Sequence, residues 1–159
     1  MSKLRIYLET SVLNFYFAND SPDKKQDTMR LFDEIKQGKY EAYVSYVVID
    51  EINRASEGKK QKLLSLLTEY DITVLNDGSD VDKLADVYVF EGVIPIKYRN
   101  DALHIAMATI AGLDIILSWN FQHIVKRKTV IMTGLINARE GFKNIDIYSP
   151  SEVIDYYEE

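Results

Sequence analysis

Short apolar runs alternate along the chain with longer segments in which apolar residues recur three and four positions apart. The short runs are typical of buried strands, and the longer spacing is typical of helices with one apolar face. The pattern predicts strands at residues 4–8, 42–48, 72–75, 114–117 and 145–148. It predicts helices at residues 22–38, 50–55, 59–70, 79–92 and 100–112, with a terminal helix after residue 149.

Several of the predicted helices begin with capping residues. Pro22 follows Ser21 and suits the first position of a helix, where the missing backbone N–H of proline costs nothing. Asn100 is a candidate N-cap for the helix that ends near Gly112. Residues 149–152 (SPSE) have the S-x-x-E capping pattern with proline at the first helical position, which predicts the terminal helix.

Strands that alternate with helices predict right-handed crossovers and parallel pairing. The expected fold class is therefore α/β, a three-layer sandwich with a mostly parallel central sheet of about five strands and helices on both faces. The 159 residues are enough to bury a substantial core, and we expect a single domain over residues 1–159.

The amino-acid composition limits the kinds of catalytic or metal site that the chain can contain. The chain has no cysteine, which excludes disulfides, thiolate zinc sites and cysteine nucleophiles, and its two histidines make a histidine-rich zinc site unfavourable. Any metal is therefore expected to be bound by oxygen. No apolar run approaches the roughly 18 residues that span a bilayer, and no signal-peptide pattern precedes the first strand, so we expect a cytoplasmic location and no membrane partner.

The net charge of −6 argues against a protein that coats nucleic acid through a basic face. It does not exclude a nucleic-acid enzyme, which can bridge phosphate to an acidic site through a metal and use local basic positions. Most such positions also fit ordinary solvated surfaces. The candidates are Lys59, Lys60 and Lys62, then Lys97 and Arg99, then Lys126, Arg127 and Lys128.

Three carboxylates lie in short polar patches that follow or adjoin predicted strands and helices: Glu9 in LETS, Glu51 in IDE and Asp101 in NDALH. The fourth patch, SWNF, offers Asn120 instead. Ligands of parallel sheets bind beyond the carboxyl ends of the strands, so these side chains are expected to converge there. Carboxylates held together on a rigid fold are typical ligands of Mg²⁺ or Mn²⁺. Each acid taken alone also fits a plainer role, at a strand end or in a first helical turn.

Two nearby acids do not fit this site. Asp114 precedes its strand, which places it about 13 Å from the carboxyl edge at about 3.3 Å per residue. Asp50 and Glu51 are helical neighbours that point about 100° apart, so only one of them can face the site. We prefer Glu51.

Other polar residues of the patches are candidates for supporting or substrate-binding roles. Thr10 and Ser11 are expected to turn the chain and to support the site through hydroxyl hydrogen bonds, and Ser118 adjoins Asn120 in the fourth patch. His104 lies three positions after Asp101 on the same helical face, where it either approaches substrate or is structural.

Two further residues have ambiguous roles. Trp119 stacks a base or, more simply, packs in the core. His123 is interpreted as a turn residue.

At this point the residues resemble a family, the PIN-domain nucleases, and in particular the VapC-like toxins of toxin–antitoxin pairs. The resemblance rests on LETSV, SYVVIDEI, DALHIAMATIAGLDIILSWNFQHI and IYSPSEVIDY, of which the third segment is the most specific. It implies a PIN-like fold and an Mg²⁺- or Mn²⁺-dependent endoribonuclease, the toxin of a type II pair. It also implies a small antitoxin protein as partner and a homodimer.

By position, the resemblance gives Glu9, Glu51 and Asp101 the first three acidic sites of the family and places Asn120 where many members have a fourth Asp. Three negative charges then face the four positive charges of two divalent ions, which favours a single metal or a second one delivered with substrate. In the expected mechanism Glu9 and Asp101 hold the metal, with Glu51 a further candidate ligand that orients or deprotonates the attacking water. The resemblance implies products with a 5′-phosphate and a 3′-hydroxyl.

Two alternatives come from other classes. A phospho-receiver domain also collects acids at this edge, but it needs paired acids after the first strand and a lysine after the fifth, and the chain offers neither. A PIN fold that binds RNA or a protein with weak or no nuclease activity stays open, because Asn120 replaces the fourth carboxylate.

Overall fold

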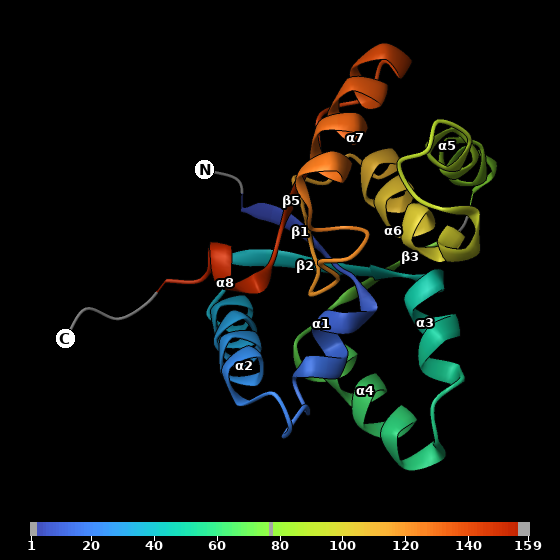
Figure 1. Ribbon diagram of the computed structural model, residues 1–159. Helices are drawn as coiled ribbons and strands as arrows, with labels where there is room; N and C mark the ends of the chain where they lie inside the picture. Colours follow the sequence, from blue (N-terminus) through green and yellow to red (C-terminus); the bar gives the residue numbers. More distant parts are fainter. Residues whose placement is uncertain (1–2, 77, 156–159) are drawn as a thin grey trace.

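The computed structural model describes residues 3–76 and 78–155 (Figure 1). Its centre is a five-stranded sheet in the order β3-β2-β1-β4-β5, and every pairing is parallel. The predicted parallel sheet is therefore confirmed. The strands are β1 (Leu4–Leu8), β2 (Tyr40–Ser45), β3 (Thr73–Leu75), β4 (Ile115–Leu117) and β5 (Asp146–Tyr148).

Helices cover both faces of the sheet, which gives the three predicted layers. In Figure 1, α1, α2 and α4 lie on one side of the sheet, whereas α5, α6 and α7 lie on the other. The bounds of the helices on the first side are α1 (Thr10–Phe15), α2 (Pro22–Lys36) and α4 (Glu57–Glu69). Two further helices are α3 (Tyr46–Asn53) and α8 (Pro150–Val153). The others are α5 (Ser79–Phe90), a 3₁₀ turn η1 (Ile96–Tyr98), α6 (Arg99–Ile110) and α7 (Arg127–Glu140).

Two predicted helix starts need correction. Residues 46–48, predicted as the end of a strand, form the first turn of α3, because the Ser45 hydroxyl caps that helix by accepting a hydrogen bond from the backbone N–H of Val47. Asn100, predicted as an N-cap, lies inside the first turn of α6, because η1 runs directly into that helix and Tyr98 takes the N-cap position.

The predicted starts at Pro22 and at the terminal helix are confirmed. Pro22 is the first residue of α2, and Ser149 and Glu152 form the reciprocal capping box of α8. The last residues of the predicted terminal helix, 156–159, lie outside the described residues.

Two helices were not predicted, α1 and α7. Helix α1 begins at Thr10, where a turn was expected. Helix α7 buries Thr133 and Asn137 and exposes Ile131 and Leu135, so its hydrophobic pattern is inverted and gives no sign of an apolar face.

Helix α6 is the central helix of the second layer. It is buried continuously from Ala102 through Thr109 and packs against α5 and β4. In the sheet, the fully buried Tyr7 contacts this helix, since its hydroxyl lies 2.6 Å from Nδ1 of His104. Polar residues on α6 are therefore sealed inside the protein unless they lie in its first turn. No helix in the described part of the chain is long and apolar enough to cross a membrane.

Candidate active site

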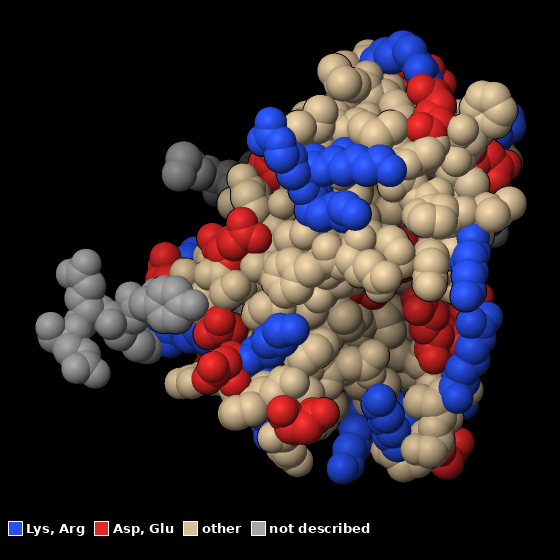
Figure 2. All heavy atoms as spheres, viewed as in Figure 1, with Lys and Arg blue, Asp and Glu red and all other residues tan. Residues whose placement is uncertain are grey.

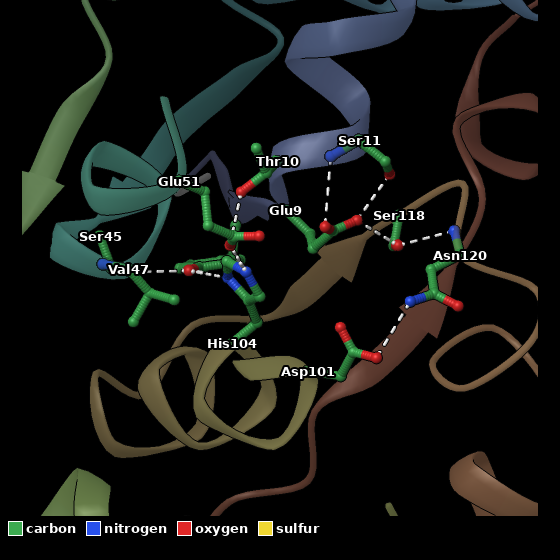
Figure 3. A network of polar contacts seen from close by, with 11 residues as sticks. Glu9, Thr10, Ser11, Ser45, Val47, Glu51, Asp101, His104, Ser118 and Asn120 are labelled. Atoms are coloured by element: carbon green, nitrogen blue, oxygen red, sulfur yellow. Dashed lines mark hydrogen bonds and ion pairs between the residues drawn. The ribbon is translucent and has the colours of Figure 1, made fainter. Parts of the chain in front are cut away.

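The predicted polar patches meet at the carboxyl edge of the sheet (Figure 3). Glu9 directly follows β1, and Ser118 directly follows the neighbouring strand β4. Glu51 comes from α3, which follows β2, and Asp101 comes from the first turn of α6. The structure therefore brings the three predicted carboxylates to one edge, where ligands of parallel sheets bind.

Glu9 is the N-cap of α1 and is fixed by three donors. Its Oε1 atom accepts hydrogen bonds from the hydroxyls of Ser11 and Ser118, at oxygen–oxygen distances of 2.6 and 2.5 Å. Its Oε2 atom accepts one from the backbone N–H of Ser11, at 3.2 Å. This last bond satisfies an N–H that would otherwise lack a partner at the start of a helix. Since only 6% of Glu9 is exposed, its carboxylate is oriented before any ligand binds.

The same two serines tie the ends of β1 and β4 together. The Ser11 hydroxyl accepts a hydrogen bond from the backbone N–H of Trp119 at 2.8 Å, and the Ser118 hydroxyl accepts one from the backbone N–H of Asn120 at 2.9 Å. Each hydroxyl thus donates to Glu9 and accepts from the segment after β4. These are the hydroxyl hydrogen bonds expected of residues that support the site.

A chain of buried, hydrogen-bonded polar groups holds the Glu51 carboxylate in place. Its Oε1 atom lies 2.6 Å from Nε2 of His104 and accepts a hydrogen bond from the Thr10 hydroxyl at 3.0 Å. The Nδ1 atom of His104 lies 2.6 Å from the Tyr7 hydroxyl, which lies 2.7 Å from the Ser45 hydroxyl. Because Tyr7, Ser45 and His104 are fully buried, this chain fixes the position of Glu51.

The pKa values of Glu51 and His104 are shifted in opposite directions. Burial alone would raise the pKa of Glu51, but its hydrogen bonds with His104 and Thr10 outweigh burial and lower that pKa. Burial alone would lower the pKa of His104, but the bond to Glu51 and the surrounding negative charges raise that pKa. Burial holds the pKa of Tyr7 well above its ordinary value. These opposite shifts favour the charged forms of Glu51 and His104 in each other's presence, beside a phenol whose raised pKa favours its neutral form.

Asp101 faces the segment after β4. Its Oδ2 atom accepts a hydrogen bond from Nδ2 of Asn120 at 3.2 Å and lies 3.1 Å from Nδ1 of His123. Burial and the negative charge of Glu9 raise the pKa of Asp101. The negative charge of Glu9 thus disfavours ionisation of Asp101.

His123 was missed as a site residue. It lies in a turn, as predicted, but its ring contacts Asp101 and stacks on the ring of Tyr98 with a centroid distance of 4.1 Å. Its backbone N–H donates to Oδ1 of Asn120 at 2.9 Å. The only signal in the sequence was its position three residues after Asn120, which allows a turn to bring the two together.

The burial of Trp119 and His104 decides between the two roles that the sequence left open for each. Trp119 is 7% exposed, and its indole N–H donates to the Thr28 hydroxyl at 2.9 Å, so it packs in the core and presents no face to a base. His104 is fully buried, so the structural interpretation holds and the approach to substrate is excluded.

The two acids set aside in the sequence lie outside the site. Asp50 is exposed next to Glu51. Asp114 precedes β4 and binds the backbone N–H of Arg5 at 2.8 Å and Nζ of Lys143 at 2.5 Å. The prediction that Asp114 is structural is therefore confirmed.

The lysines and arginines predicted as possible phosphate-binding positions differ in their exposure and in whether an acid holds them. Lys126, Arg127 and Lys128 are exposed at the start of α7, where Figure 2 shows Lys and Arg side chains gathered on the surface. Arg99 is held by Asp86, at 2.8 Å between Nη2 and Oδ1, and Lys97 is exposed beside it. Lys59, Lys60 and Lys62 belong to α4.

The donor chemistry of Glu9 and Asp101 suits a hard divalent cation. Within residues 3–76 and 78–155, no group of three or more His, Cys, Asp or Glu side chains is arranged to hold one ion. Glu9 and Asp101 are nevertheless a pair of largely buried carboxylates whose repulsion a shared cation would offset. In the described part of the chain, Oδ1 of Asp101 and Oε2 of Glu51 accept no hydrogen bond.

Fold and site together define an α/β protein with a carboxylate cluster at the carboxyl edge of an all-parallel sheet. A solved structure with this fold is a chain of VapBC2 from Rickettsia felis, a complex crystallised with a DNA fragment from its promoter. The two chains are 14% identical over 92% of this chain and 98% of that one, with a TM-score of 0.54. This likeness confirms the expected PIN-like α/β fold. No protein-family model matches the chain, and no curated protein matches it.

Proposed function

We propose that this protein is a metal-dependent endoribonuclease. The observation that carries the proposal is the convergence of Glu9, Glu51 and Asp101 at one sheet edge, each with its carboxylate held in place by hydrogen bonds. Mg²⁺ or Mn²⁺ is the expected cofactor, because both ions prefer oxygen ligands.

Glu9 and Asp101 are the residues that would hold the ion. Ser118 donates to the Glu9 carboxylate and Asn120 to that of Asp101, and a bound cation would counter the negative charge of Glu9 that raises the pKa of Asp101. When bound, a divalent ion supplies positive charge against the scissile phosphate and lowers the pKa of a nearby water.

Glu51 is suited to orient and deprotonate the attacking water. Thr10 and His104 occupy its Oε1 atom, and Oε2 accepts no hydrogen bond from the described residues. The carboxylate is ionised near neutral pH, which a proton acceptor requires, and its lowered pKa makes it a weaker base than an ordinary glutamate. Glu51 thus acts as a positioned base that a buried histidine holds in one orientation, and it remains a further candidate ligand of the ion.

Asn120 takes a different role from a fourth carboxylate. Its Nδ2 atom donates to Asp101, and its Oδ1 atom accepts the backbone N–H of His123. Each end of the amide therefore has one hydrogen-bond partner, and Asn120 orients Asp101 through its Nδ2 atom. This arrangement favours a single resident ion.

RNA cleavage by the purified protein tests this proposal. Wild-type protein should cleave RNA in the presence of Mg²⁺ or Mn²⁺ and leave 5′-phosphate ends. Addition of a chelator should stop this cleavage. Asp101→Asn should lose cleavage at least 100-fold, on the order of a lost transition-state contact of 2.7 kcal/mol or more. Asp50→Asn, which changes an exposed acid next to Glu51, should cleave like the wild type.

Other results of this assay would count against the proposal. Cleavage that persists equally in Asp101→Asn would come from another protein. Binding of RNA without cleavage under any metal would favour the alternative function, a PIN-fold binding module in which Asn120 has weakened the site.

We also propose that the protein is the toxin of a toxin–antitoxin pair and forms a homodimer. The support is its VapC-like resemblance and the shared fold with a chain of a VapBC2 complex. A small protein encoded next to this gene, when co-expressed, should copurify and suppress cleavage, and the protein alone should elute as a dimer. A small neighbour that neither binds nor inhibits would contradict the toxin role.

A further inference from the structure

The segment that follows β4 presents alternate residues to different neighbours. Ser118 and Asn120 donate hydrogen bonds to the two carboxylates proposed to hold the ion, as Figure 3 shows. Trp119 lies between them in the chain and faces α2 instead, because its indole N–H donates to the Thr28 hydroxyl at 2.9 Å. The contacts that this segment makes with α2 therefore also fix the two side chains that orient the carboxylates.

Three aromatic rings on the α2 side of the segment surround one ammonium group. The Nζ atom of Lys24 lies 5.2 Å from the ring centre of Phe15, which belongs to α1. It lies 5.7 Å from the ring centre of Trp119 and 5.5 Å from that of Phe121. A cation within about 6 Å of a ring centre is attracted by the negative charge of the ring face. Lys24 thus joins α2 to α1 and to the segment after β4 through a single charge.

Lys24 and Thr28 hold the indole together from successive turns of α2. The buried Thr28 hydroxyl accepts a hydrogen bond from the indole N–H of Trp119 and donates one to the backbone carbonyl of Lys24 at 2.7 Å. The indole is therefore held at its N–H by one residue and at its ring by the other. The helix itself gives no reason for a lysine here, because the helix dipole disfavours a cation in the first turn.

The charge of Lys24, and not only its aliphatic stem, takes part in this cluster. A lysine stem packs on rings whatever the state of its head group. In this cluster the Nζ atom itself lies near all three ring centres. Two of these rings, Trp119 and Phe121, flank Asn120 in the chain, so a shift of either ring displaces the amide that donates to Asp101.

We infer that Lys24 is a positioning residue of the carboxylate site. Its ammonium group holds Trp119 and Phe121 from the side of α2 and thereby fixes the Asn120 amide that orients Asp101. The inference rests on the proposed function for the ion that the site binds. It adds a residue on the α2 side of the segment to those that determine the affinity for that ion.

The fluorescence of Trp119 tests the inference without metal. Trp119 is the single tryptophan of the chain and is 7% exposed. Lys24→Met keeps an unbranched apolar side chain but removes the charge. In chelator, acrylamide should therefore quench Trp119 more steeply in this variant than in the wild type. Lys24→Arg should restore the wild-type quenching, because a guanidinium group is attracted to aromatic rings as well.

Mn²⁺ binding is the second measurement, made without RNA from the electron paramagnetic resonance signal of the free ion. Lys24→Met should weaken binding about 2- to 10-fold, as expected for the loss of a partly exposed cation–π contact. Lys24→Arg should bind like the wild type. Circular dichroism of each variant confirms that it is folded.

The matched control is Lys36→Met. Lys36 is the last residue of α2, at the opposite end of the helix from Lys24, and its Nζ atom lies 5.5 Å from the ring centre of Tyr70. The variant thus loses a cation–π contact of the same kind at a distance from the site. Its Trp119 quenching and its Mn²⁺ affinity should both equal those of the wild type.

Three results would overturn the inference: wild-type Mn²⁺ affinity in Lys24→Met, even with altered quenching, equal losses in Lys36→Met, or no recovery in Lys24→Arg. If the wild type cleaves RNA with metal, the nuclease proposal survives each of these results. The expected Mn²⁺ result in a wild type that cleaves no RNA would overturn the nuclease proposal alone. A wild type that binds no Mn²⁺ would overturn both.

Discussion

The Nε2 atom of His104 lies 2.6 Å from the Oε1 atom of Glu51, and it joins a fully buried residue of α6 to the half-buried carboxylate of α3. Behind His104, the Tyr7 hydroxyl bridges its Nδ1 atom to Ser45. A protonated His104 donates to Tyr7, which then donates to Ser45, and a neutral one accepts from Tyr7 instead. The chain of hydrogen bonds is therefore complete in either protonation state.

Tyr7→Phe should destabilise the protein by about 1–3 kcal/mol, because it leaves the buried Nδ1 atom of His104 without a partner and removes one of the two hydrogen bonds of the Ser45 hydroxyl. The free energy of unfolding in urea measures this loss. Tyr43→Phe is the matched control, since the Tyr43 hydroxyl donates to the exposed Glu41 at 3.2 Å and its removal should cost little. Equal effects of the two variants would show that the bridge contributes nothing.

The His104–Glu51 pair should make the stability of the metal-free protein depend on pH. The pKa of His104 is raised, so its contribution is full below the ordinary value of 6.5 and is lost as pH rises through the raised pKa. The pKa of Glu51 is lowered, so its contribution is full above 4.5 and is lost as pH falls through the lowered pKa. Both contributions are full between those two pH values.

Urea unfolding of wild type and His104→Gln in chelator, from about pH 4 to pH 9, measures this dependence. The difference between the two unfolding free energies should be largest between pH 4.5 and 6.5 and should narrow at higher pH. A difference that stays constant across the range would mean that folding does not shift the pKa of His104.

Asn120→Asp should destabilise the metal-free protein by about 1–3 kcal/mol, because Asp101 loses a donor and gains a like charge. Added Mn²⁺ should recover part of the loss, since a further carboxylate strengthens an oxygen site. Thermal unfolding with and without Mn²⁺ measures both effects.

Asn144→Asp is the control for this prediction. Nδ2 of Asn144 likewise donates to an aspartate, Asp146, but on the exposed surface, so neither the loss nor the recovery should appear. If Mn²⁺ stabilises the Asn120→Asp and Asn144→Asp variants equally, the extra carboxylate at position 120 does not reach the ion.

The sequence was sufficient to predict what depends on chain order. Alternating apolar runs predicted the parallel sheet, and the rule that parallel strands present ligands at their carboxyl ends brought Glu9, Glu51 and Asp101 to one edge and set Asp114 aside. It also separated Glu51 from the exposed Asp50, because helical neighbours point in different directions.

Contacts between segments that are far apart in the chain could not be predicted from the sequence. The Tyr7 hydroxyl meets residues 38 and 97 positions away, and no periodicity encodes that meeting. Helix α7 escaped prediction because it buries Thr133 and Asn137 and exposes Leu135. His123 was missed because its role depends on a tertiary contact with Asp101.

The most direct test of the central claim is the single-turnover rate of RNA cleavage as a function of Mn²⁺ concentration, for wild type and Glu9→Gln. The glutamine keeps the size of the side chain and an oxygen that can accept from Ser11, but it removes the charge proposed to hold the ion. We predict a rate that rises with Mn²⁺ and saturates in the wild type, and a loss of at least 100-fold, on the order of 2.7 kcal/mol or more, in Glu9→Gln. Equal rates and equal Mn²⁺ dependence in the two proteins would contradict the account.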